Sequence, residues 1–358
     1  MAIHFHTLTV KQIRHETIDC VSIAFDIPET LEKEFEFLQG QSITVRVFDH
    51  QEEIRRSYSI CSSPLDKELR VAVKKVPGGY FSTYANSSLR KGDTLEVMSP
   101  SGNFNTKLHP ANNKKYLAFA AGSGITPLLS IIKTTLATEP GSLCTLVYGN
   151  RNTNSIIFKE ELEALKNKYM ERFMMIHVLS RERTDSEINY GRINADKCNQ
   201  LSRLIDLKEF DEYFLCGPES MIFGVKDHLQ SVGIDIKKIH FELFTTPVRK
   251  KRIDTEVGTP VSNRTSSQIT VKVDGRSFDF KLEFDSNNIL DAALAEGADL
   301  PFACKGGVCC TCKARLIEGK VEMEVNYGLE PDEVEAGFIL TCQSHPRSEK
   351  VVVDYDVK

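Results

Sequence analysis

Cys304-Lys305-Gly306-Gly307-Val308-Cys309-Cys310-Thr311-Cys312 gathers four of the chain's ten cysteines into one short stretch, and Cys342 follows further along the sequence. Deprotonated thiols are strong ligands for iron and zinc, so this stretch predicts a metal centre. Gly306 and Gly307 favour this interpretation. A backbone that wraps tightly around a centre, with its N–H groups turned inward, needs conformations that glycine adopts without strain.

The cysteine spacing resembles that of plant-type ferredoxins, in which C-x4-C-x2-C and a distant fourth cysteine hold a [2Fe-2S] cluster. The resemblance implies four ligands and leaves Cys310 out; the ligands are Cys304, Cys309, Cys312 and Cys342. Zinc is a weaker alternative, because structural zinc usually takes two C-x2-C pairs. Disulfides are weaker still, since the remaining cysteines are scattered among apolar runs like buried thiols. These are Cys20, Cys61, Cys144, Cys198 and Cys216.

Length and composition limit the class of protein. The chain has 358 residues, 41% of them hydrophobic, which is enough for two or three domains with separate cores. No apolar run reaches the roughly 20 residues of a membrane span, and a formal net charge of −5 argues against a nucleic-acid partner. The opening Met-Ala-Ile-His-Phe-His is no apolar leader, and the thiols favour a reducing compartment. We therefore expect a cytoplasmic protein with no membrane insertion.

Residues 1–110 are predicted to form an antiparallel β-barrel, because short segments alternate apolar and polar residues between turns. One strand carries Arg56-Ser57-Tyr58-Ser59, and Gly78-Gly79-Tyr80-Phe81-Ser82 opens a short helix. An arginine, an aromatic ring and a hydroxyl on alternate residues of one strand suit a phosphate and a flat ring. A Gly-Gly turn before a helix offers N–H groups to a pyrophosphate. Taken alone, each string is more typical of an ordinary strand or turn.

In this order the two strings resemble the FAD-binding signature of the ferredoxin-NADP reductase superfamily, R-x-Y-S followed by G-G-x-x-S. The resemblance implies FAD rather than FMN. It places Arg56 at the pyrophosphate, Tyr58 on the isoalloxazine ring and Ser59 at the N5 atom, with Gly79 to Ser82 capping the phosphates. The implied FAD-binding residues are Arg56, Ser57, Tyr58, Ser59, Gly78, Gly79, Phe81 and Ser82.

Residues 111–246 are predicted to form a doubly wound parallel α/β domain, because apolar strands alternate with helical stretches. The first strand leads into Ala121-Gly122-Ser123-Gly124-Ile125-Thr126-Pro127 and then a helix over Leu128–Leu136. A glycine-rich turn of this kind brings helix N–H groups to a pyrophosphate. G-x-G-x-x-P departs from the Rossmann G-x-G-x-x-G and by itself is equally a tight turn. It resembles the nicotinamide-binding motif of the same superfamily.

A later strand ends in Cys216-Gly217-Pro218, which resembles the C-G-P motif of the superfamily, and a helix containing Met221 follows. By resemblance, Cys216 and Thr126 lie near the nicotinamide and the flavin N5; a plain buried thiol is the alternative for Cys216. The domain ends in Phe241-Glu242-Leu243-Phe244, which resembles an F-E-x-F ending and implies that Phe244 lies close to the flavin. The residues expected at the reacting centre are Ser59, Thr126, Cys216 and Phe244.

The prediction of the coenzyme depends on arginines. Ser180 and Arg181 directly follow the third strand of this domain. An arginine there can pair with the 2′-phosphate of NADPH, whereas an acidic residue would bond a ribose hydroxyl. We predict NADPH, with NADH as the alternative. The expected NAD(P)-binding residues are Gly122, Gly124, Thr126, Pro127, Arg151, Ser180, Arg181, Tyr190, Cys216, Gly217, Pro218 and Met221.

Residues 247–267 are rich in Pro, Ser, Thr and charge without periodicity and are predicted to be a linker. Residues 268–358 are predicted to be a plant-type ferredoxin domain of the α+β β-grasp fold. Asp274-Gly275 indicates a hairpin, and a helix is expected over 289–296, capped by Ser286 or Asn287 and stopped by Gly297. The expected fold class is therefore multidomain, with an antiparallel barrel, a doubly wound parallel sheet and a β-grasp domain.

The resemblance covers nearly the whole chain and implies a reductase that passes electrons from NADPH to FAD and on to the [2Fe-2S] cluster. The implied electron acceptor is an iron-containing oxygenase component. Two alternatives stay open. The reductase can serve another oxygenase, a hydroxylase or a desaturase, or the chain can be a non-enzymatic [2Fe-2S] electron carrier. The sequence contains no motif of its own for activating oxygen.

Overall fold

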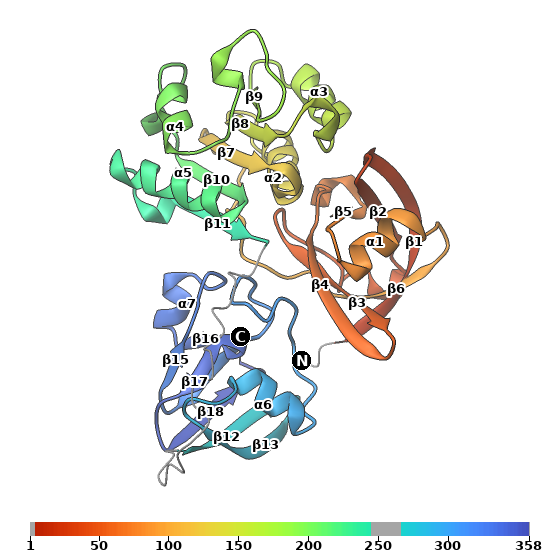
Figure 1. Ribbon diagram of the computed structural model, residues 1–358, viewed down its shortest axis with the longest axis vertical. Coiled ribbons are helices and arrows are strands. Elements are labelled where there is room, and N and C mark those ends of the chain that lie inside the picture. Colours follow the sequence, from red (N-terminus) through yellow and green to blue (C-terminus); the bar gives the residue numbers. More distant parts are fainter. Residues whose placement is uncertain (1–3, 245–265, 358) are drawn as a thin grey trace. The chain divides into compact units, whose positions relative to one another are not determined.

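The computed structural model describes residues 4–244 and 266–357. The chain divides into two compact units, the first of which is Phe5–Phe244. This unit holds a β-barrel and a parallel α/β sheet, and the other holds the C-terminal sheet (Figure 1). The predicted linker lies outside the described residues except for Ser266 and Ser267, which begin a strand. The domain boundaries otherwise remain predictions.

The N-terminal domain is an antiparallel barrel with one α-helix. Its six strands follow the order β4-β3-β6-β1-β2-β5, and an antiparallel bridge between Ile60, directly after β4, and Val71 of β5 closes the sheet. The elements are β1 (Phe5–Thr17), β2 (Cys20–Asp26), η1 (Glu29–Leu31), β3 (Ser42–Asp49), β4 (Glu52–Ser59), η2 (Pro64–Asp66), β5 (Leu69–Lys74), α1 (Tyr80–Ser87) and β6 (Thr94–Met98).

Strand β5 faces two hydrophobic cores. Its residues Leu69, Val71 and Val73 fill the barrel interior, and the intervening Ala72 belongs to the core of the α/β domain. Cys20 and Cys61 join that second core from the barrel side. Successive side chains of a strand point to opposite faces, so β5 reads as an almost continuous apolar run because both of its faces are covered.

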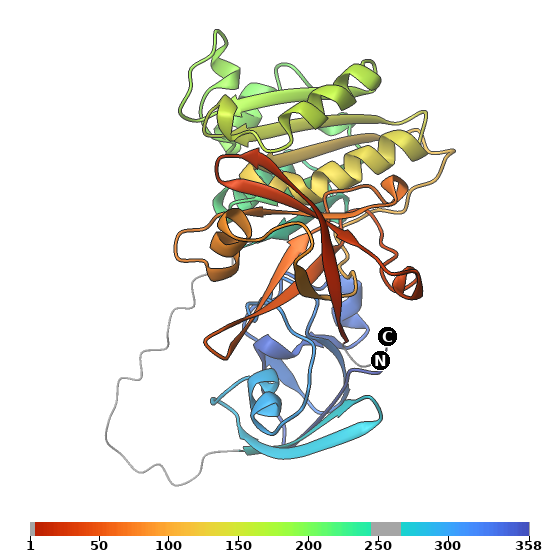
Figure 2. The same cartoon turned by 90° about the vertical axis from the view of Figure 1, so that its right-hand side faces the viewer.

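The second domain is a five-stranded parallel sheet in the order β11-β10-β7-β8-β9. Figure 2 shows helix α2 running alongside these strands. The elements are β7 (Lys115–Ala121), η3 (Gly122–Gly124), α2 (Ile125–Thr138), β8 (Leu143–Asn150), η4 (Thr153–Ser155), α3 (Lys159–Lys168), β9 (Phe173–Leu179), η5 (Glu187–Asn189), α4 (Ala195–Leu201), η6 (Leu207–Glu209), β10 (Glu212–Gly217), α5 (Glu219–Ser231), η7 (Ile236–Lys238) and β11 (Ile239–Leu243).

The direction of winding reverses between β7 and β10. The chain runs from β7 to β8 and β9 and then returns to the other side of β7 to form β10. Ligands of doubly wound sheets bind outside the carboxyl ends of the strands at such a switch point. Those ends here are the glycine turn after β7 and the Cys216–Pro218 segment that ends β10. The predicted doubly wound fold is confirmed.

The C-terminal unit is a mixed sheet in the order β13-β12-β18-β14-β16, with a separate pair β15-β17. Its only parallel pairing among the described strands joins β12 to β18. The elements are β12 (Ser266–Val273), β13 (Arg276–Glu283), α6 (Ile289–Ala295), β14 (Lys313–Glu318), β15 (Val321–Met323), α7 (Pro331–Glu335), β16 (Phe338–Leu340), η8 (Thr341–Gln343), β17 (Ser344–Pro346) and β18 (Lys350–Asp354).

Local signals in this unit were predicted correctly with one exception. Asp274 and Gly275 form the two-residue hairpin turn with positive φ of 52° and 69°, as a type I′ turn requires. Helix α6 ends before Gly297, whose φ is 85°. The predicted cap was wrong, because Asn288 accepts the hydrogen bond from the N–H of Asp291. Across the described ranges, no helix is both long and apolar enough to span a membrane.

Candidate redox site

The four cysteines predicted as cluster ligands lie in two pairs. The sulfurs of Cys304 and Cys309 are 3.1 Å apart, and the thiols of Cys312 and Cys342 hydrogen-bond to each other. The first pair is partly exposed and the second is buried. Within the described residues, no three His, Cys, Asp or Glu side chains converge on a single-ion position. A four-cysteine [2Fe-2S] centre takes two protein sulfurs at each iron, and the two pairs fit that requirement.

Backbone N–H groups of the loop point at the sulfurs. The N–H of Gly306 donates to the sulfur of Cys304 at 3.3 Å. The Cys309 thiol and the N–H groups of residues 306, 308 and 309 lower the pKa of Cys304 to about 6, against burial. In the other pair, the hydrogen bond from Cys312 lowers the pKa of Cys342. Hydrogen bonding to the charged form favours the thiolate, which is the form that binds iron.

Glycines let the loop close around the cysteines. Gly307 has a φ of 73°, and a Cβ atom there would lie 2.8 Å from the carbonyl oxygen of Val325. At Gly328 a Cβ would lie 2.6 Å from the carbonyl oxygen of Cys309. Cys310, predicted not to be a ligand, packs against the hydrophobic core of this unit.

The predicted flavin strand is β4. Arg56 is exposed, and its guanidinium donates to the carbonyl of Arg55 at 2.8 Å. The Tyr58 ring lies 5.5 Å from the Phe81 ring of α1, centroid to centroid. Tyr58 and Ser59 are neighbours, so they point to opposite faces of the strand. The expectation that arginine, ring and hydroxyl alternate therefore holds only for Arg56 and Tyr58, because Ser57 and Ser59 share the other face.

The predicted phosphate turn precedes α1. Gly78 has a φ of 75°, and Gly79 is the N-cap residue of the helix, with no side chain bonded to its first turn. The hydroxyl of Ser82 accepts from the N–H of Val76 at 3.1 Å and donates to the carbonyl of Gly79 at 3.2 Å. Ser82 thus holds the turn in shape. A helix start without a side-chain cap leaves N–H groups for an anion.

Ser59 reaches the α/β domain. Its hydroxyl donates to Oε2 of Glu242 at 3.0 Å. Glu242 on β11 is paired in register with Cys216 on β10. Burial raises the pKa of Glu242 to about 7, although the hydrogen bond from Ser59 acts in the opposite direction. Glu242 was not among the predicted site residues, although it lies inside the F-E-x-F string that ends the domain.

The two nicotinamide motifs meet backbone to backbone. A Cβ on Gly124 would lie 2.1 Å from the carbonyl oxygen of Cys216, so only glycine fits there. A Cβ on Gly217 would lie 2.7 Å from the Met221 side chain. The hydroxyl of Thr126 is buried and donates to the carbonyl of Ser123 at 3.0 Å. Residues far apart in sequence therefore form one surface at the switch point.

The predicted coenzyme arginines lie side by side. The N–H of Arg181 donates to the carbonyl of Arg151 at 2.8 Å, and both residues are exposed at the carboxyl ends of β9 and β8. Ser180 donates through its N–H to Asn150 at 2.9 Å. Tyr190 forms an isolated parallel β-bridge with Leu179. The Cζ atom of Arg183 lies over the Tyr190 ring, 5.3 Å from the ring centroid. Arg183 was not predicted, although it stands two residues after Arg181.

Phe244 is 41% exposed and is the last described residue of the first unit. It follows Glu242 by two positions, after the end of β11. Its predicted proximity to the flavin remains a prediction.

The fold and the sites define an oxidoreductase built from three cofactor domains. Family models match residues 7–106 as an oxidoreductase FAD-binding domain, residues 119–227 as an oxidoreductase NAD-binding domain and residues 271–347 as a 2Fe-2S iron-sulfur cluster binding domain. The chain is therefore an NAD(P)H-dependent enzyme that uses FAD and a [2Fe-2S] cluster.

Two curated relatives cover the chain almost completely. One component of the 1,2-phenylacetyl-CoA epoxidase of Escherichia coli (strain K12) is 47% identical over 356 residues, 99% of this chain and 98% of the relative. The ferredoxin reductase component of 3-ketosteroid-9-alpha-monooxygenase from Rhodococcus rhodochrous is 36% identical, over 97% of this chain and 96% of the relative. The chain belongs to the ferredoxin-NADP reductase superfamily and, within it, to the family of these oxygenase reductase components.

From sequence alone, the cysteine loop and the Lys74-Lys-Val-Pro-Gly-Gly79 string look most like the reductase component of phenylacetyl-CoA epoxidase. Solved structures confirm the three-domain fold. Phthalate dioxygenase reductase matches with a TM-score of 0.58 at 21% identity, covering 98% of both chains. An intact type IV self-sufficient cytochrome P450 monooxygenase matches with a TM-score of 0.69 at 20% identity, covering 98% of this chain and 41% of that one.

Proposed function

We propose that this chain is the reductase component of a phenylacetyl-CoA epoxidase, passing electrons from NADPH through FAD and its [2Fe-2S] cluster to an iron-containing oxygenase component. The identity of 47% with the Escherichia coli epoxidase component, against 36% with a ketosteroid relative, supports this client. The observation that carries the reductase chemistry is the meeting of Ser59 with Glu242 and of Gly124 with Cys216. These contacts join the predicted flavin and nicotinamide motifs at one place.

The flavin is held by the barrel. Arg56 pairs with the pyrophosphate, Tyr58 packs on the isoalloxazine and Ser59 bonds the N5 edge. The uncapped start of α1 supports phosphate binding there, because its N–H groups carry partial positive charge. Residues assigned to FAD are Arg56, Ser57, Tyr58, Ser59, Gly78, Gly79, Phe81 and Ser82.

FAD, when bound, supplies a two-electron acceptor that can release electrons one at a time. The residues around it orient the nicotinamide and control protons. Thr126 and Cys216 line the approach of the nicotinamide, and Phe244 covers the flavin. Glu242 has a pKa near neutrality and holds Ser59 in place, so it can hold or release a proton next to the reacting edge. Reactants held in the right geometry gain many orders of magnitude in rate.

NADPH is the proposed coenzyme, because Arg151 and Arg181 are exposed next to each other at the sheet edge. Two guanidinium groups can bind a 2′-phosphate by charge-assisted hydrogen bonds. Arg183, stacked on Tyr190, adds a third positive charge nearby in sequence. NADH remains the alternative. The assigned coenzyme residues also include Gly122, Gly124, Pro127, Ser180, Gly217, Pro218 and Met221.

The cluster ligands are Cys304, Cys309, Cys312 and Cys342. Plant-type ligation implies a reduction potential on the order of −400 mV, low enough to reduce an iron oxygenase. We further propose a cytoplasmic location, supported by the ten free cysteines. A ring-hydroxylating, steroid or alkane oxygenase is the alternative client, favoured by the ketosteroid relative.

An anaerobic titration with NADPH, and separately with NADH, tests the electron path. Bleaching of the flavin absorbance and a rhombic EPR signal from the reduced cluster are expected. A cluster signal that requires dithionite would contradict the path. The client is tested by mixing the protein with the oxygenase component of phenylacetyl-CoA epoxidase and following NADPH oxidation that depends on phenylacetyl-CoA. A ketosteroid oxygenase component is the control, and equal or greater coupling to it would contradict the proposed client.

A further inference from the structure

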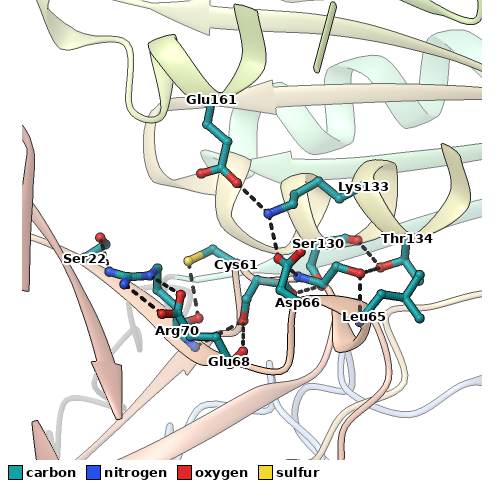
Figure 3. A network of polar contacts seen from close by, with 12 residues as sticks. Ser22, Cys61, Leu65, Asp66, Glu68, Arg70, Ser130, Lys133, Thr134 and Glu161 are labelled. Atoms are coloured by element: carbon teal, nitrogen blue, oxygen red, sulfur yellow. Dashed lines mark hydrogen bonds and ion pairs between the residues drawn. The ribbon is translucent and has the colours of Figure 1, made fainter. Parts of the chain in front are cut away.

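A polar contact joins the barrel to the middle of helix α2. Ser130 donates to the carbonyl of Ser62 at 2.6 Å, and the hydroxyls of Ser63 and Thr134 are 2.8 Å apart. The Lys133 ammonium donates to Oδ2 of Asp66 at 2.6 Å. Figure 3 shows Asp66 from the barrel side near Ser130, Lys133 and Thr134 of α2. We call this set the interdomain clamp: Ser62, Ser63, Asp66, Ser130, Lys133 and Thr134.

Both halves of the clamp are held rigidly. On the barrel side, Asp66 accepts from the N–H of Ser63 at 2.8 Å in a capping box of η2. This hydrogen bond orients the carboxylate independently of the lysine. On the other side, Lys133 also donates to Glu161 of α3 at 2.6 Å. Burial lowers the pKa of Lys133, but Glu161 and Asp66 raise it by more, so the lysine stays charged.

Arg70 ties the barrel half of the clamp to the sheet. Its N–H donates to the hydroxyl of Ser62 at 3.1 Å, and its guanidinium reaches Ser22 at 3.0 Å and Gln12 at 2.7 Å. It also makes two hydrogen bonds to Glu68. Figure 3 shows Arg70 to the left of the clamp residues Asp66 and Lys133, with Ser22 and Glu68 next to it. A shift of α2 relative to the barrel would therefore have to displace barrel strands as well as the loop that carries Ser62 and Asp66.

The clamp lies close, along the chain, to residues assigned to hydride transfer. Ser62 follows Ser59 by three positions, a span of at most about 10 Å along the chain. Ser130 follows Thr126 by one turn of the same helix, a rise of about 6 Å. The backbone between Ser59 and Ser62 is fixed, because Ile60 donates to Gln41 at 2.8 Å. The clamp is thus joined by short spans of chain to Ser59 on the barrel side and to Thr126 on the helix side.

Hydrogen bonds fix the position of α2 relative to the barrel more closely than apolar contacts do. Hydrophobic packing is non-directional and permits small sliding of one surface on another, whereas hydrogen bonds weaken steeply outside narrow ranges of distance and angle. The three clamp residues on α2 are spaced i, i+3 and i+4, so they share one face of the helix and resist both sliding and rotation. A displacement of 1 Å can cost about a hundredfold in rate.

We propose that the interdomain clamp, with Lys133 at its centre, is a positioning device that sets the distance between the nicotinamide turn and the flavin strand. The proposal rests on the proposed roles of Ser59 and Thr126. Lys133 acts through the helix and touches neither cofactor.

The test compares full-length variants loaded with FAD. Lys133→Met removes the ammonium and keeps the length of the stem, and Thr134→Val removes one hydroxyl and keeps the shape. Lys115→Met is the control for loss of an ion pair that does not cross between the domains, because Lys115 makes a 2.6 Å ion pair with Glu209 inside the α/β domain. Stopped-flow flavin reduction at saturating coenzyme is measured with protiated and C4-deuterated coenzyme, together with FAD content. Hydrogen–deuterium exchange is followed in segments 60–70 and 125–138 of the oxidised, coenzyme-free protein.

Lys133→Met is expected to slow flavin reduction about tenfold or more and to raise the isotope effect, with FAD content kept. Exchange should rise in both segments, and Thr134→Val should give a smaller effect of the same kind. Lys115→Met should match the wild type. Rates within about twofold of wild type in both clamp variants, or faster exchange in one segment alone, would overturn the proposal. If Lys133→Met loses FAD or unfolds, the flavin reduction rate and the exchange of Thr134→Val decide whether the proposal holds.

Failure of the proposed function has a different signature. In that case the wild-type flavin itself is not reduced by either coenzyme, whereas the exchange measurement needs no turnover. Coupled exchange in the two segments would then still support a mechanical clamp, and uncoupled exchange would overturn it.

Discussion

The hydroxyl of Ser59 donates a 3.0 Å hydrogen bond to the carboxylate of Glu242, which stands 183 positions later in the chain. The contact joins the end of the predicted flavin strand to the last strand of the α/β sheet. Glu242 is paired in register with Cys216, so one half-buried carboxyl connects both halves of the reacting centre. Its pKa of about 7 makes that connection sensitive to pH in the physiological range.

Glu242→Gln is expected to remove a pH dependence of flavin reduction centred near pH 7. Burial favours the neutral form of Glu242, and the amide is neutral at every pH. Stopped-flow reduction rates between about pH 5.5 and 8.5, which spans the range where catalytic acids and bases usually titrate, check this. An inflection near pH 7 that persists in the variant would assign the titration to another group.

The same substitution should change stability against pH. The folded-state pKa of Glu242 is raised above the unfolded value, so the folded state binds the proton more tightly. Its stabilising contribution is present at low pH and is lost as pH rises from the ordinary carboxyl range through about 7. The Tm of Glu242→Gln, relative to that of the wild type, should therefore rise above pH 7, by about 2–4 °C for each kcal/mol of stabilisation that the wild type loses. A Tm difference that is constant between pH 5 and 8, within roughly 1 °C, would contradict the assigned shift.

Gly124→Ala should disrupt the switch point. The added Cβ would lie 2.1 Å from the carbonyl oxygen of Cys216, and backbone atoms on both sides must move. We expect a loss of about 1–3 kcal/mol in the free energy of unfolding and at least about tenfold weaker coenzyme binding. Denaturant unfolding and coenzyme titration measure the two effects.

Gly224→Ala is the matched control for that variant. Gly224 lies in helix α5, where a Cβ would meet nothing closer than 4.0 Å. Alanine there should stabilise the helix by about 0.5–1 kcal/mol. Equal destabilisation by both substitutions would show that the close contact of Gly124 with Cys216 does not cause the loss in the free energy of unfolding.

Cys342→Ser should abolish the visible and EPR spectra of the cluster and leave flavin reduction by NADPH intact, because Cys342 belongs to the second unit. Cys310→Ala is the control and should keep the cluster, since Cys310 packs on the hydrophobic core. Iron content and EPR after dithionite give the readout. Loss of the cluster in Cys310→Ala would reassign the ligands.

Arg181→Ala should raise the KM for NADPH about tenfold, as expected for the loss of a charge-assisted hydrogen bond, with little change for NADH. Arg203→Ala is a control, because Arg203 is exposed after α4 rather than at the carboxyl ends of the strands. Steady-state kinetics with both coenzymes decide. An equal rise for NADPH and NADH would remove the argument for a 2′-phosphate site.

The sequence by itself determined what is encoded in short, contiguous strings. The cysteine loop is one run of residues, and its spacing resembles that of plant-type ferredoxins. The pairing of Cys304 with Cys309, and of Cys312 with the distant Cys342, is visible only in the structure. Asp274-Gly275 specified its hairpin because few residues accept positive φ at two successive positions. The limit of such signals is visible at α6. Ser286, Asn287 and Asn288 are all good caps, and only the tertiary fold selected Asn288.

Only the tertiary structure decided which distant residues meet. Glu242 reaches Ser59 because β11 lies beside β10 and the α/β sheet packs on the barrel. The interdomain clamp likewise pairs Asp66 with Lys133 across 67 positions. A lysine on a helix and an aspartate in a turn look like solvated surface charges in the sequence. Their partnership arises only when the barrel and the α/β domain come together, because tertiary contacts, and not any local pattern, bring side chains from distant positions within hydrogen-bond distance.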